Sequence, residues 1–405
     1  MTTTTTVRTV AWPPGIPPAA RAALKLLAQL RHGTLTLHLP DGSAQRFGEG
    51  EPHAALHLAS WQPFTRALRS GDIGFAESYV DGEWSTPSLP DLLRLVLRNR
   101  EALEAGIHGH WWGRLAYRLR HLLHRNTRAG SRRNIHAHYD LGNAFYALWL
   151  DPSMNYSAAC FDGQPGQDLE QAQRVKMRRA LQSAQVGPGT RVLEIGCGWG
   201  AVAELAAGEF GAHVTGVTLS TEQLAWARER LQRAGLAPQA DLRLQDYRDI
   251  ADGPYDAIVS IEMLEAVGRE WWPTYFRSLR RLLKPGGRAC IQTIEMADDL
   301  WPRYIRSTDF IQQYVFPGGC LPCPAEFRRQ AEAAGLRIVA SHAFGADYAE
   351  TLRRWRERFL ARRAEVLALG FDERFIRLWE FYLGYCEAAF AAGSTDVVQY
   401  TLQPA

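Results

Sequence analysis

From residue 186 onward, the chain alternates between short apolar runs and longer amphipathic segments. The apolar runs are typical of strands buried on both faces, and the segments between them, such as 221–235 and 272–284, carry apolar residues at helical spacing. This alternation predicts an α/β fold with a doubly wound, mostly parallel sheet of seven strands and helices on both faces. The last strand could run antiparallel, and residues 349–393 before it are predicted to form a helical insertion. The predicted strands are 191–196, 212–219, 241–246, 256–263, 287–294, 336–342 and 396–404.

The earlier part of the chain has a different pattern, which predicts a separate small domain. A helical segment at 22–30 precedes two alternating runs within 33–48, and Asp41-Gly42 between these runs is a typical hairpin turn. We therefore predict a disordered tail at 1–20, a small α+β domain at 21–125 and a larger domain at 126–405.

Composition narrows the class of protein. The 405 residues exceed what one typical core needs, and a net charge of +3 is too small for a polyanion binder, so we expect no nucleic acid partner. No apolar run is long enough to span a membrane. Six cysteines do not make a disulfide scaffold in a chain of this length, which indicates a reducing, cytoplasmic environment. Cys320 and Cys323 have the spacing of half a zinc site, but no second pair exists, and we expect no metal.

Basic side chains crowd the segment 114–138, which contains no acidic residue. Such a segment is either a solvated helix face and linker or a contact for anionic lipid or an anionic substrate. The sequence leaves both interpretations open. The basic residues between Arg114 and His138 are Arg118, Arg120, His121, His124, Arg125, Arg128, Arg132, Arg133 and His136.

The first strand of the predicted sheet runs into a glycine turn and a helix, in the sequence TRVLEIGCGWGAVAELAA. A dinucleotide site would place its third glycine one residue later, and a phosphate-binding loop would end in Gly-Lys-Ser or Gly-Lys-Thr. Gly196, Gly198 and Gly200 therefore favour a nucleoside-like ligand without a pyrophosphate group. Because ligands of doubly wound sheets bind at the carboxyl ends of the strands, we expect the site at this turn.

Acidic and aromatic side chains flank the expected ligand. Glu194 could fix the glycine turn or accept a hydrogen bond from a cationic ligand, while Asp246 and Tyr247 could bind the exocyclic amine and the ring of a purine. S-adenosylmethionine, which carries a sulfonium and an ammonium but no phosphate, suits these surroundings. The alternative is another nucleotide-binding sheet whose glycines only tighten the turn.

The second predicted strand ends in GVTLSTEQ rather than in an acidic residue for the ribose hydroxyls. Thr218 and Gln223 are the polar candidates to replace that residue. Ser220 and Gln223 also have the spacing of a capping box, so Gln223 could either cap the helix or contact the ligand.

These motifs resemble those of the cyclopropane-fatty-acyl-phospholipid synthase family, which includes the mycolic acid cyclopropane synthases. The matching segments are HYDLGNAFYALWLDPSMNYS, VLEIGCGWG, GVTLSTEQ, QDYRDI, KPGG, FPGGCLP and FGADY, so the resemblance extends from about residue 60 to the C-terminus. It implies an S-adenosylmethionine-dependent enzyme with a Rossmann-like methyltransferase sheet. The implied cofactor contacts are Tyr156, Ser157, Gly196, Gly198, Thr218, Gln223, Tyr247 and Arg248.

The resemblance also implies a carbon nucleophile. The π bond of a cis-unsaturated acyl chain, held in a membrane phospholipid, attacks the sulfonium methyl group, and a base then removes a proton from the resulting carbocation. Such a site must be dry and apolar, and carboxylates or aromatic faces must stabilise the cation. The aromatic candidates, of which only a few are expected to line the acyl site, are Trp199, Trp271, Trp272, Tyr275, Phe276, Phe310, Tyr314 and Phe316.

The implied base is a bicarbonate ion, and this chain departs from the implied set of ligands. Glu265, Tyr348 and the backbone of Ile294 match, but the cysteine position is Ala158 and the histidine position is Gln292. Bicarbonate binding is therefore in doubt. We expect Glu265, desolvated beside a transient cation, to stabilise that cation or to take the proton.

Cys386, in LGYCEAAF, matches a cysteine that is sometimes regarded as catalytic, although a buried small residue is the alternative. Glu265, Gln292, Tyr348 and Cys386 are thus the predicted catalytic residues. The sequence as a whole predicts a C-methyltransferase of unsaturated acyl chains, cytoplasmic and peripherally associated with the inner face of the membrane, which could form a homodimer. Its product would be a cyclopropane or a methyl-branched chain. The alternatives are a methyltransferase for a small soluble acceptor and a non-catalytic lipid-binding protein.

Overall fold

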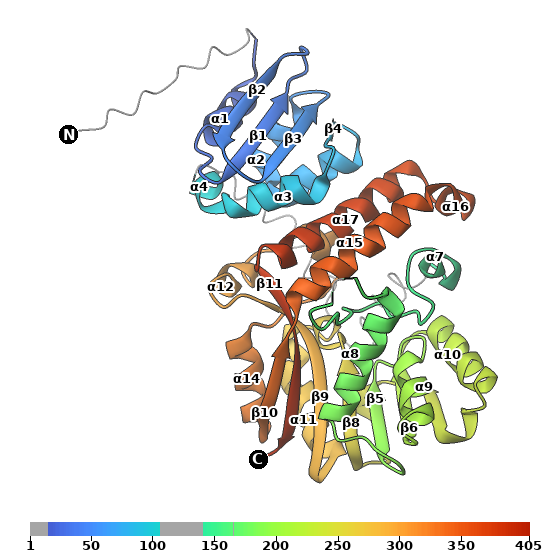
Figure 1. Cartoon of the computed structure of the whole chain (residues 1–405). Helices are drawn as coiled ribbons and strands as arrows, with labels where there is room; N and C mark the ends of the chain where they lie inside the picture. The colour runs from blue at the N-terminus through green and yellow to red at the C-terminus, as the bar shows by residue number, and fades with distance from the viewer. Residues whose placement is uncertain (1–14, 106–140, 165) are drawn as a thin grey trace. The chain divides into compact units, whose positions relative to one another are not determined.

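The computed structural model describes residues 15–105, 141–164 and 166–405, and the chain divides into two compact units, Met1–Trp111 and Trp112–Ala405 (Figure 1). The predicted domain boundary at residues 125/126 and the basic segment at 114–138 lie outside the described residues, as do residues 1–14 of the predicted tail.

The N-terminal unit is built on a four-stranded sheet with the order β2-β1-β3-β4. Strand β1 pairs antiparallel with β2 and parallel with β3. The predicted hairpin between β1 and β2 is confirmed, with Gly42 at a φ of 84° and Asp41 Oδ1 accepting a hydrogen bond from Ser43 N at 2.9 Å. The elements are α1 (Pro18–Leu27), β1 (Gly33–His38), β2 (Ala44–Glu49), β3 (His53–Leu58), α2 (Gln62–Val80), β4 (Trp84–Ser85), α3 (Leu89–Arg98) and α4 (Arg100–Ala105).

Helix α1 begins inside the segment 1–20 that was predicted to be a tail. Pro18 suits the first turn of a helix, where its missing N–H has no intrahelical acceptor to lose. Ala20 is fully buried. Proline and alanine give a weak hydrophobic period, which is why the sequence pattern placed the start of the helix too late.

The larger unit contains a seven-stranded sheet with the order β10-β11-β9-β8-β5-β6-β7, which confirms the predicted doubly wound α/β fold. Strands β5 to β9 pair in parallel, and β11 runs antiparallel to both β9 and β10. The strands are β5 (Arg191–Ile195), β6 (His213–Thr218), β7 (Ala240–Leu244), β8 (Tyr255–Ile261), β9 (Leu283–Met296), β10 (Leu336–Ala343) and β11 (Thr395–Pro404).

The central strands send alternate side chains into two separate cores, one on each face of the sheet. Val192 belongs to the core beneath α8, α9 and α10, and Leu193 belongs to the core beneath α11 and α14. This arrangement explains the continuous apolar runs in the sequence, because a strand covered on both faces has no polar side. The covering helices are α8 (Leu169–Ser183), α9 (Ala201–Gly208), α10 (Thr221–Arg233), α11 (Trp272–Leu282) and α14 (Pro324–Ala333).

A long helical insertion separates β10 from β11, as predicted, and its helices α15 and α17 pack against each other (Figure 1). Its first turn is held against β11, since Phe344 N donates to Val397 O at 2.9 Å and Gly345 N donates to Asp396 Oδ1 at 2.7 Å. Tyr348 lies in this turn. The insertion comprises α15 (Gly345–Ala361), α16 (Arg363–Ala368) and α17 (Glu373–Ala391).

Short elements connect the strands and complete the unit. They are α7 (Asn143–Ala147), η1 (Ala237–Gln239), η2 (Tyr247–Asp249), η3 (Leu264–Ala266), η4 (Arg269–Trp271), α12 (Trp301–Tyr304) and α13 (Phe310–Tyr314).

The order of the strands reverses between β5 and β8, so the carboxyl ends of these two neighbours mark the expected ligand crevice. The glycine turn follows β5, and Glu262 follows β8. The fold therefore brings the predicted cofactor turn and a carboxylate to the same edge of the sheet.

Candidate active site

The glycine turn between β5 and α9 leaves room for a ligand to approach its backbone. Gly196, Gly198 and Gly200 have φ angles of 86°, 48° and 83°, a region that favours glycine. A Cβ atom on Gly200 would lie 2.8 Å from the Cβ of Ala227, whereas a Cβ atom on Gly198 would meet no atom within 4 Å. Packing therefore requires Gly200, while Gly198 adjoins open space.

Glu194, near the end of β5, precedes Gly196 by two residues and is buried. Its Oε2 has no hydrogen-bond partner among the residues that the structure describes. Burial raises its pKa to about 8, against the opposing effect of the Lys176 charge. A buried polar atom without a partner indicates a place for a ligand or a water molecule. Together with the open glycine turn, it fits the predicted S-adenosylmethionine.

Thr218 and Gln223 contact each other at the end of β6. Thr218 Oγ1 donates to Gln223 Oε1 at 3.1 Å and accepts from Ser220 N at 3.2 Å. Ser220 caps α10 by accepting from Gln223 N at 3.2 Å. A capping box would require the Gln223 side chain to accept from the Ser220 N–H. The Gln223 side chain faces Thr218 instead. Its contact with the cofactor stays a prediction.

Asp246 has a strong partner within the protein. Its carboxylate accepts from the guanidinium of Arg248 at 2.8 and 2.6 Å and from the backbone N of Arg248 at 3.0 Å, and both side chains are buried. Tyr247 between them packs against Tyr275. The predicted binding of a purine amine by Asp246 would have to compete with this bidentate pair.

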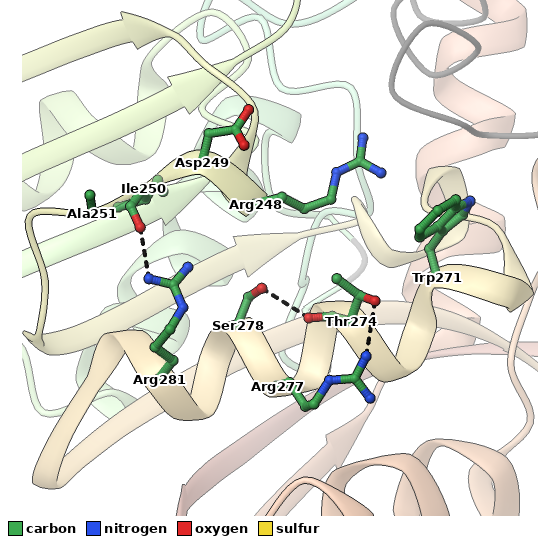
Figure 2. A pocket seen from close by; sticks show the side chains of 9 residues that line it. All are labelled: Arg248, Asp249, Ile250, Ala251, Trp271, Thr274, Arg277, Ser278 and Arg281. Carbon is green, nitrogen blue, oxygen red and sulfur yellow. Dashed lines mark hydrogen bonds between the residues drawn. The ribbon is translucent and has the colours of Figure 1, made fainter.

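A pocket of about 770 Å³ opens beside Arg248, between the segment that follows β7 and helix α11 (Figure 2). Arg277 and Arg281 also line it; Arg277 donates to Thr274 Oγ1 at 3.2 Å and Arg281 to Ile250 O at 2.7 Å. The guanidinium of Arg248 lies 5.5 Å from the ring centre of Trp271, which lines the pocket as well. Arg248 is already paired with Asp246, and Asp249 also lines the pocket, so Arg277 and Arg281 are the groups that make it attractive to anions.

Glu262, directly after β8, is surrounded by donors from three distant segments. Ala158 N and Gln292 Nε2 donate to its Oε1 at 2.8 and 2.7 Å, and Tyr348 OH donates to its Oε2 at 2.9 Å. The φ angle of Glu262 is 48°, which is uncommon for a residue other than glycine. Three positions that were predicted to surround an anion therefore meet at a carboxylate of the chain itself.

The amide of Gln292 is oriented by a second glutamine. Gln292 on β9 lies opposite Gln399 on β11, and Gln399 Nε2 donates to Gln292 Oε1 at 3.0 Å. Because the carbonyl oxygen of Gln292 accepts this bond, its Nε2 is turned to Glu262 as a donor. Gln292 thus offers a neutral, fixed donor at the position where the family resemblance implied a histidine.

Glu265, in η3, belongs to a different set of hydrogen bonds. Its Oε1 accepts from Ile294 N at 2.5 Å and from Thr293 Oγ1 at 3.1 Å, and its Oε2 has no partner among the described residues. Burial raises the pKa of Glu265 to about 8, and the negative charge of Glu262 adds to the rise. Glu265 therefore keeps its proton at neutral pH.

Lys176 on α8 is a fully buried cation whose charge acts on Glu262 and Glu194. Its Nζ donates to Ser157 Oγ at 2.7 Å and to Asn155 Oδ1 at 3.2 Å, and burial lowers its pKa to about 8. Burial raises the pKa of Glu262, but the Ala158 donor and the charge of Lys176 oppose this rise. The lysine thus helps to keep Glu262 ionised.

The segment that carries Ala158 is fixed against α15. Ala159 N donates to Thr351 Oγ1 at 3.1 Å, and Phe161 N donates to Asp347 Oδ2 at 2.8 Å. These two bonds, directly after Ala158 in the chain, hold the Ala158 N–H at Glu262.

Aromatic side chains enclose Tyr156 next to this segment. Its ring centre lies 5.4 Å from those of Tyr146 and Trp149 and 5.5 Å from that of Trp355, and its hydroxyl is 2.7 Å from the Tyr382 hydroxyl. Aromatic faces of this kind exclude water and stabilise cations. Half of the eight aromatic residues singled out from the sequence are instead fully or almost fully buried; they are Trp272, Tyr275, Phe276 and Phe310.

The cysteines near the site lack the character of nucleophiles. Burial raises the pKa of the Cys386 thiol far above its ordinary value, and burial also raises the pKa of Cys160 to about 11. The Cys160 sulfur lies 4.0 Å from His342 Nε2 on β10. Both thiols therefore stay protonated at neutral pH, which disfavours the predicted catalytic role of Cys386.

Glu262 and Lys176 were not among the predicted site residues. Glu262 had a usable signal, because it is an acidic residue at the carboxyl end of a predicted strand, the same criterion that singled out Asp246. Lys176 had none, since a lysine in a polar helix is normally exposed.

Residues 126–400 match the family described as mycolic acid cyclopropane synthetase. Over 400 residues the chain is 42% identical to tuberculostearic acid methyltransferase UfaA1 of Mycobacterium tuberculosis, covering 95% of this chain and 92% of the relative. It is 38% identical to cyclopropane-fatty-acyl-phospholipid synthase of Escherichia coli K12, covering 86% and 88%. The structure resembles mycolic acid cyclopropane synthase CmaA1 complexed with SAH and CTAB, with a TM-score of 0.63, 30% identity and coverage of 67% and 98%.

We expect Gly198→Val to weaken the binding of S-adenosylmethionine at least tenfold, roughly 1.4 kcal/mol, because a side chain would fill the open space at the turn. Calorimetric titration measures the affinity. Gly235→Val is the matched control, since Gly235 also has a positive φ, 71°, and open space around its Cβ position, but it follows α10 away from the turn. Equal losses of affinity in both variants would remove the cofactor from the turn.

We expect the free energy of unfolding to fall as the pH rises from about 4.5 to 8, in part because of Glu265. The folded protein keeps the Glu265 proton up to a pKa of about 8, whereas the unfolded chain loses it near the ordinary glutamate pKa of 4.5, so rising pH favours unfolding. Glu265→Gln should flatten this dependence in urea unfolding at pH 5 and pH 8. Glu222→Gln, at an exposed position on α10, should leave it unchanged. An unaltered slope in Glu265→Gln would contradict the assignment of the proton.

Proposed function

The chain belongs to the mycolic acid cyclopropane synthetase family of S-adenosylmethionine-dependent methyltransferases, and we propose that it transfers a methyl or methylene group to the double bond of unsaturated acyl chains in phospholipids. The observation that carries the proposal is the half-buried Glu262 and Glu265 pair, which lies beside the glycine turn, since Met263 between them packs against Gly196. S-adenosylmethionine supplies an electrophilic methyl group at this site.

A carbon acceptor explains the combination of Glu262 with the aromatic residues around Tyr156 better than an amine or a hydroxyl acceptor does. An alkene has no proton to lose before it attacks, so the protein has no need of a base that activates the nucleophile. The need comes afterwards, when a positive charge develops on the chain. The negative charge of Glu262 and the faces of Tyr156 and Trp355 are suited to stabilise that charge in a dry site.

Names of relatives support an acyl substrate without fixing which one. One relative is named as a tuberculostearic acid methyltransferase and another as a cyclopropane-fatty-acyl-phospholipid synthase. For this chain we place a cyclopropane product slightly ahead of a methyl-branched alkene. The two products are isomers, and they differ in which proton leaves.

The predicted catalytic residues Gln292 and Tyr348 contribute as donors to Glu262.

A phospholipid substrate requires contact with a membrane surface. Among the described residues, no helix is both long enough and apolar enough to cross a bilayer. The arginine pocket of Figure 2 is suited to lipid phosphate groups, and it supports peripheral association with the inner face of the membrane.

We expect labelled S-adenosylmethionine to transfer its methyl carbon to vesicles of monounsaturated phospholipid and not to vesicles of saturated phospholipid. Mass spectrometry should find the label in the acyl chain, one CH₂ group heavier. Because a cyclopropane and a methyl-branched alkene have the same mass, proton NMR must separate ring protons from vinyl protons. Label in the headgroup, or equal transfer to saturated chains, would contradict the acyl double bond as acceptor.

We expect Arg277→Gln to weaken binding to anionic vesicles roughly fivefold at low salt, since one basic charge near a membrane contributes about 1 kcal/mol. Sedimentation with vesicles measures the effect, and rising salt should reduce the difference. Arg233→Gln is the control, because Arg233 is an exposed arginine at the end of α10 that does not line the pocket. If the two variants bind alike, the pocket does not contact lipid.

A further inference from the structure

We propose that Glu262 is the built-in general base of the reaction and takes the place of a dissociable anion. This inference rests on the proposed acyl C-methylation. It differs from the sequence-based expectation, which gave the role to Glu265.

The hydrogen bonds around Glu262 support the assignment first. The Ala158 amide, the Gln292 amide and the Tyr348 hydroxyl all donate to its carboxylate, at 2.7 to 2.9 Å. A free bicarbonate ion would need the same donors and would have to lie next to the negative charge of Glu262. Because the donors are already engaged and like charges repel, the site of this chain is filled by its own carboxylate.

The backbone of Glu262 supports the assignment independently. A φ of 48° is unfavourable at a residue other than glycine, and such strain persists where the surroundings hold it and is concentrated at functional sites. A glycine at this position would relieve the strain. The chain instead carries a residue whose carboxylate this backbone turns toward three donors.

The neighbouring charges distinguish Glu262 from Glu265. The groups that act on Glu262 are Lys176 on α8, Tyr348 on α15 and Glu265 on η3. Lys176 favours an ionised Glu262, whereas the rise of the Glu265 pKa to about 8 keeps Glu265 protonated. A base must be ionised before it can accept a proton, and the charge of Lys176 together with the bonds from Ala158 and Gln292 favours the ionised form of Glu262.

The proposed step is balanced within the substrate and the carboxylate. After methyl transfer, the acyl chain carries a carbon with an empty orbital. A carboxylate oxygen of Glu262 takes a proton from the methyl group or from an adjacent chain carbon. The electron pair of the broken C–H bond fills the empty orbital, which closes a three-membered ring in the first case and forms a double bond in the second. The neutral Glu262 then returns its proton to water when the product leaves.

The test compares wild type, Glu262→Gln and Glu262→Gly in buffer freed of carbon dioxide, with and without added bicarbonate or formate. Wild type should turn over equally in all buffers. Glu262→Gln keeps the shape of the side chain but cannot take the proton, and its turnover should fall by about 10²–10⁴-fold. Glu262→Gly relieves the φ strain and leaves a gap among the donors, so added bicarbonate or formate should restore part of its turnover.

Calorimetry and a matched variant separate a catalytic effect from a structural one. All three proteins should bind S-adenosylmethionine with the same affinity. Glu295→Gln is the control, because Glu295 is also a buried glutamate, hydrogen-bonded by Tyr400 at 2.9 Å, but it plays no part in the site; its turnover should equal wild type.

Wild-type turnover that requires added bicarbonate, or full turnover in Glu262→Gln, would overturn the assignment of Glu262. Failure of the proposed function has a different signature, since wild type would then transfer no methyl group to unsaturated phospholipid in any buffer.

Discussion

The hydrogen bonding of the Glu262 carboxylate is the constraint on which the arrangement of this end of the sheet depends. A carboxylate without water must receive hydrogen bonds from the protein, or folding would neutralise it. Its donors come from the segment before α8, from β9 and from the first turn of α15. Each donor is in turn held by a neighbour: Thr351 and Asp347 hold the segment of Ala158, and Gln399 orients Gln292. The crevice is thus shaped by the need to satisfy one anion.

The ionisable groups around the crevice form a coupled set. Lys176 acts on Glu262 and on Glu194, and Glu262 acts on Glu265. Buried together at low dielectric, these groups cannot change protonation one at a time without affecting the others. A cation that develops on the substrate would enter this set as an additional positive charge. The set already contains a carboxylate that can stabilise this charge. Electrostatic stabilisation of this kind needs little rearrangement at the moment of reaction.

The sequence was a good guide to the fold and to the cofactor turn, and a poorer one to the carboxylate site. Val192 and Leu193 are both apolar because they face two different cores, and such a pattern can be recognised without a structure. The glycines of the turn are likewise evident from their spacing. Glu262 and Glu265 look alike in sequence, however, and only the φ angle of Glu262 and the position of distant donors separate their roles. The pairing of Asp246 with Arg248 could not be predicted from the sequence, because it depends on how η2 turns.

The pairing of Gln292 with Gln399 links the chemistry to the order in which the chain folds. The two residues are 107 positions apart, and the Ala158–Glu262 and Tyr348–Glu262 contacts span 104 and 86 positions. Contacts of such range form late, because long loops must close before they stabilise anything. A folding intermediate with the central parallel strands in place could therefore already present the glycine turn, while Gln292 still lacks its orienting partner on β11. Methyl-donor binding and proton abstraction would then mature at different times, and local opening of β11 would stop the second without releasing the first.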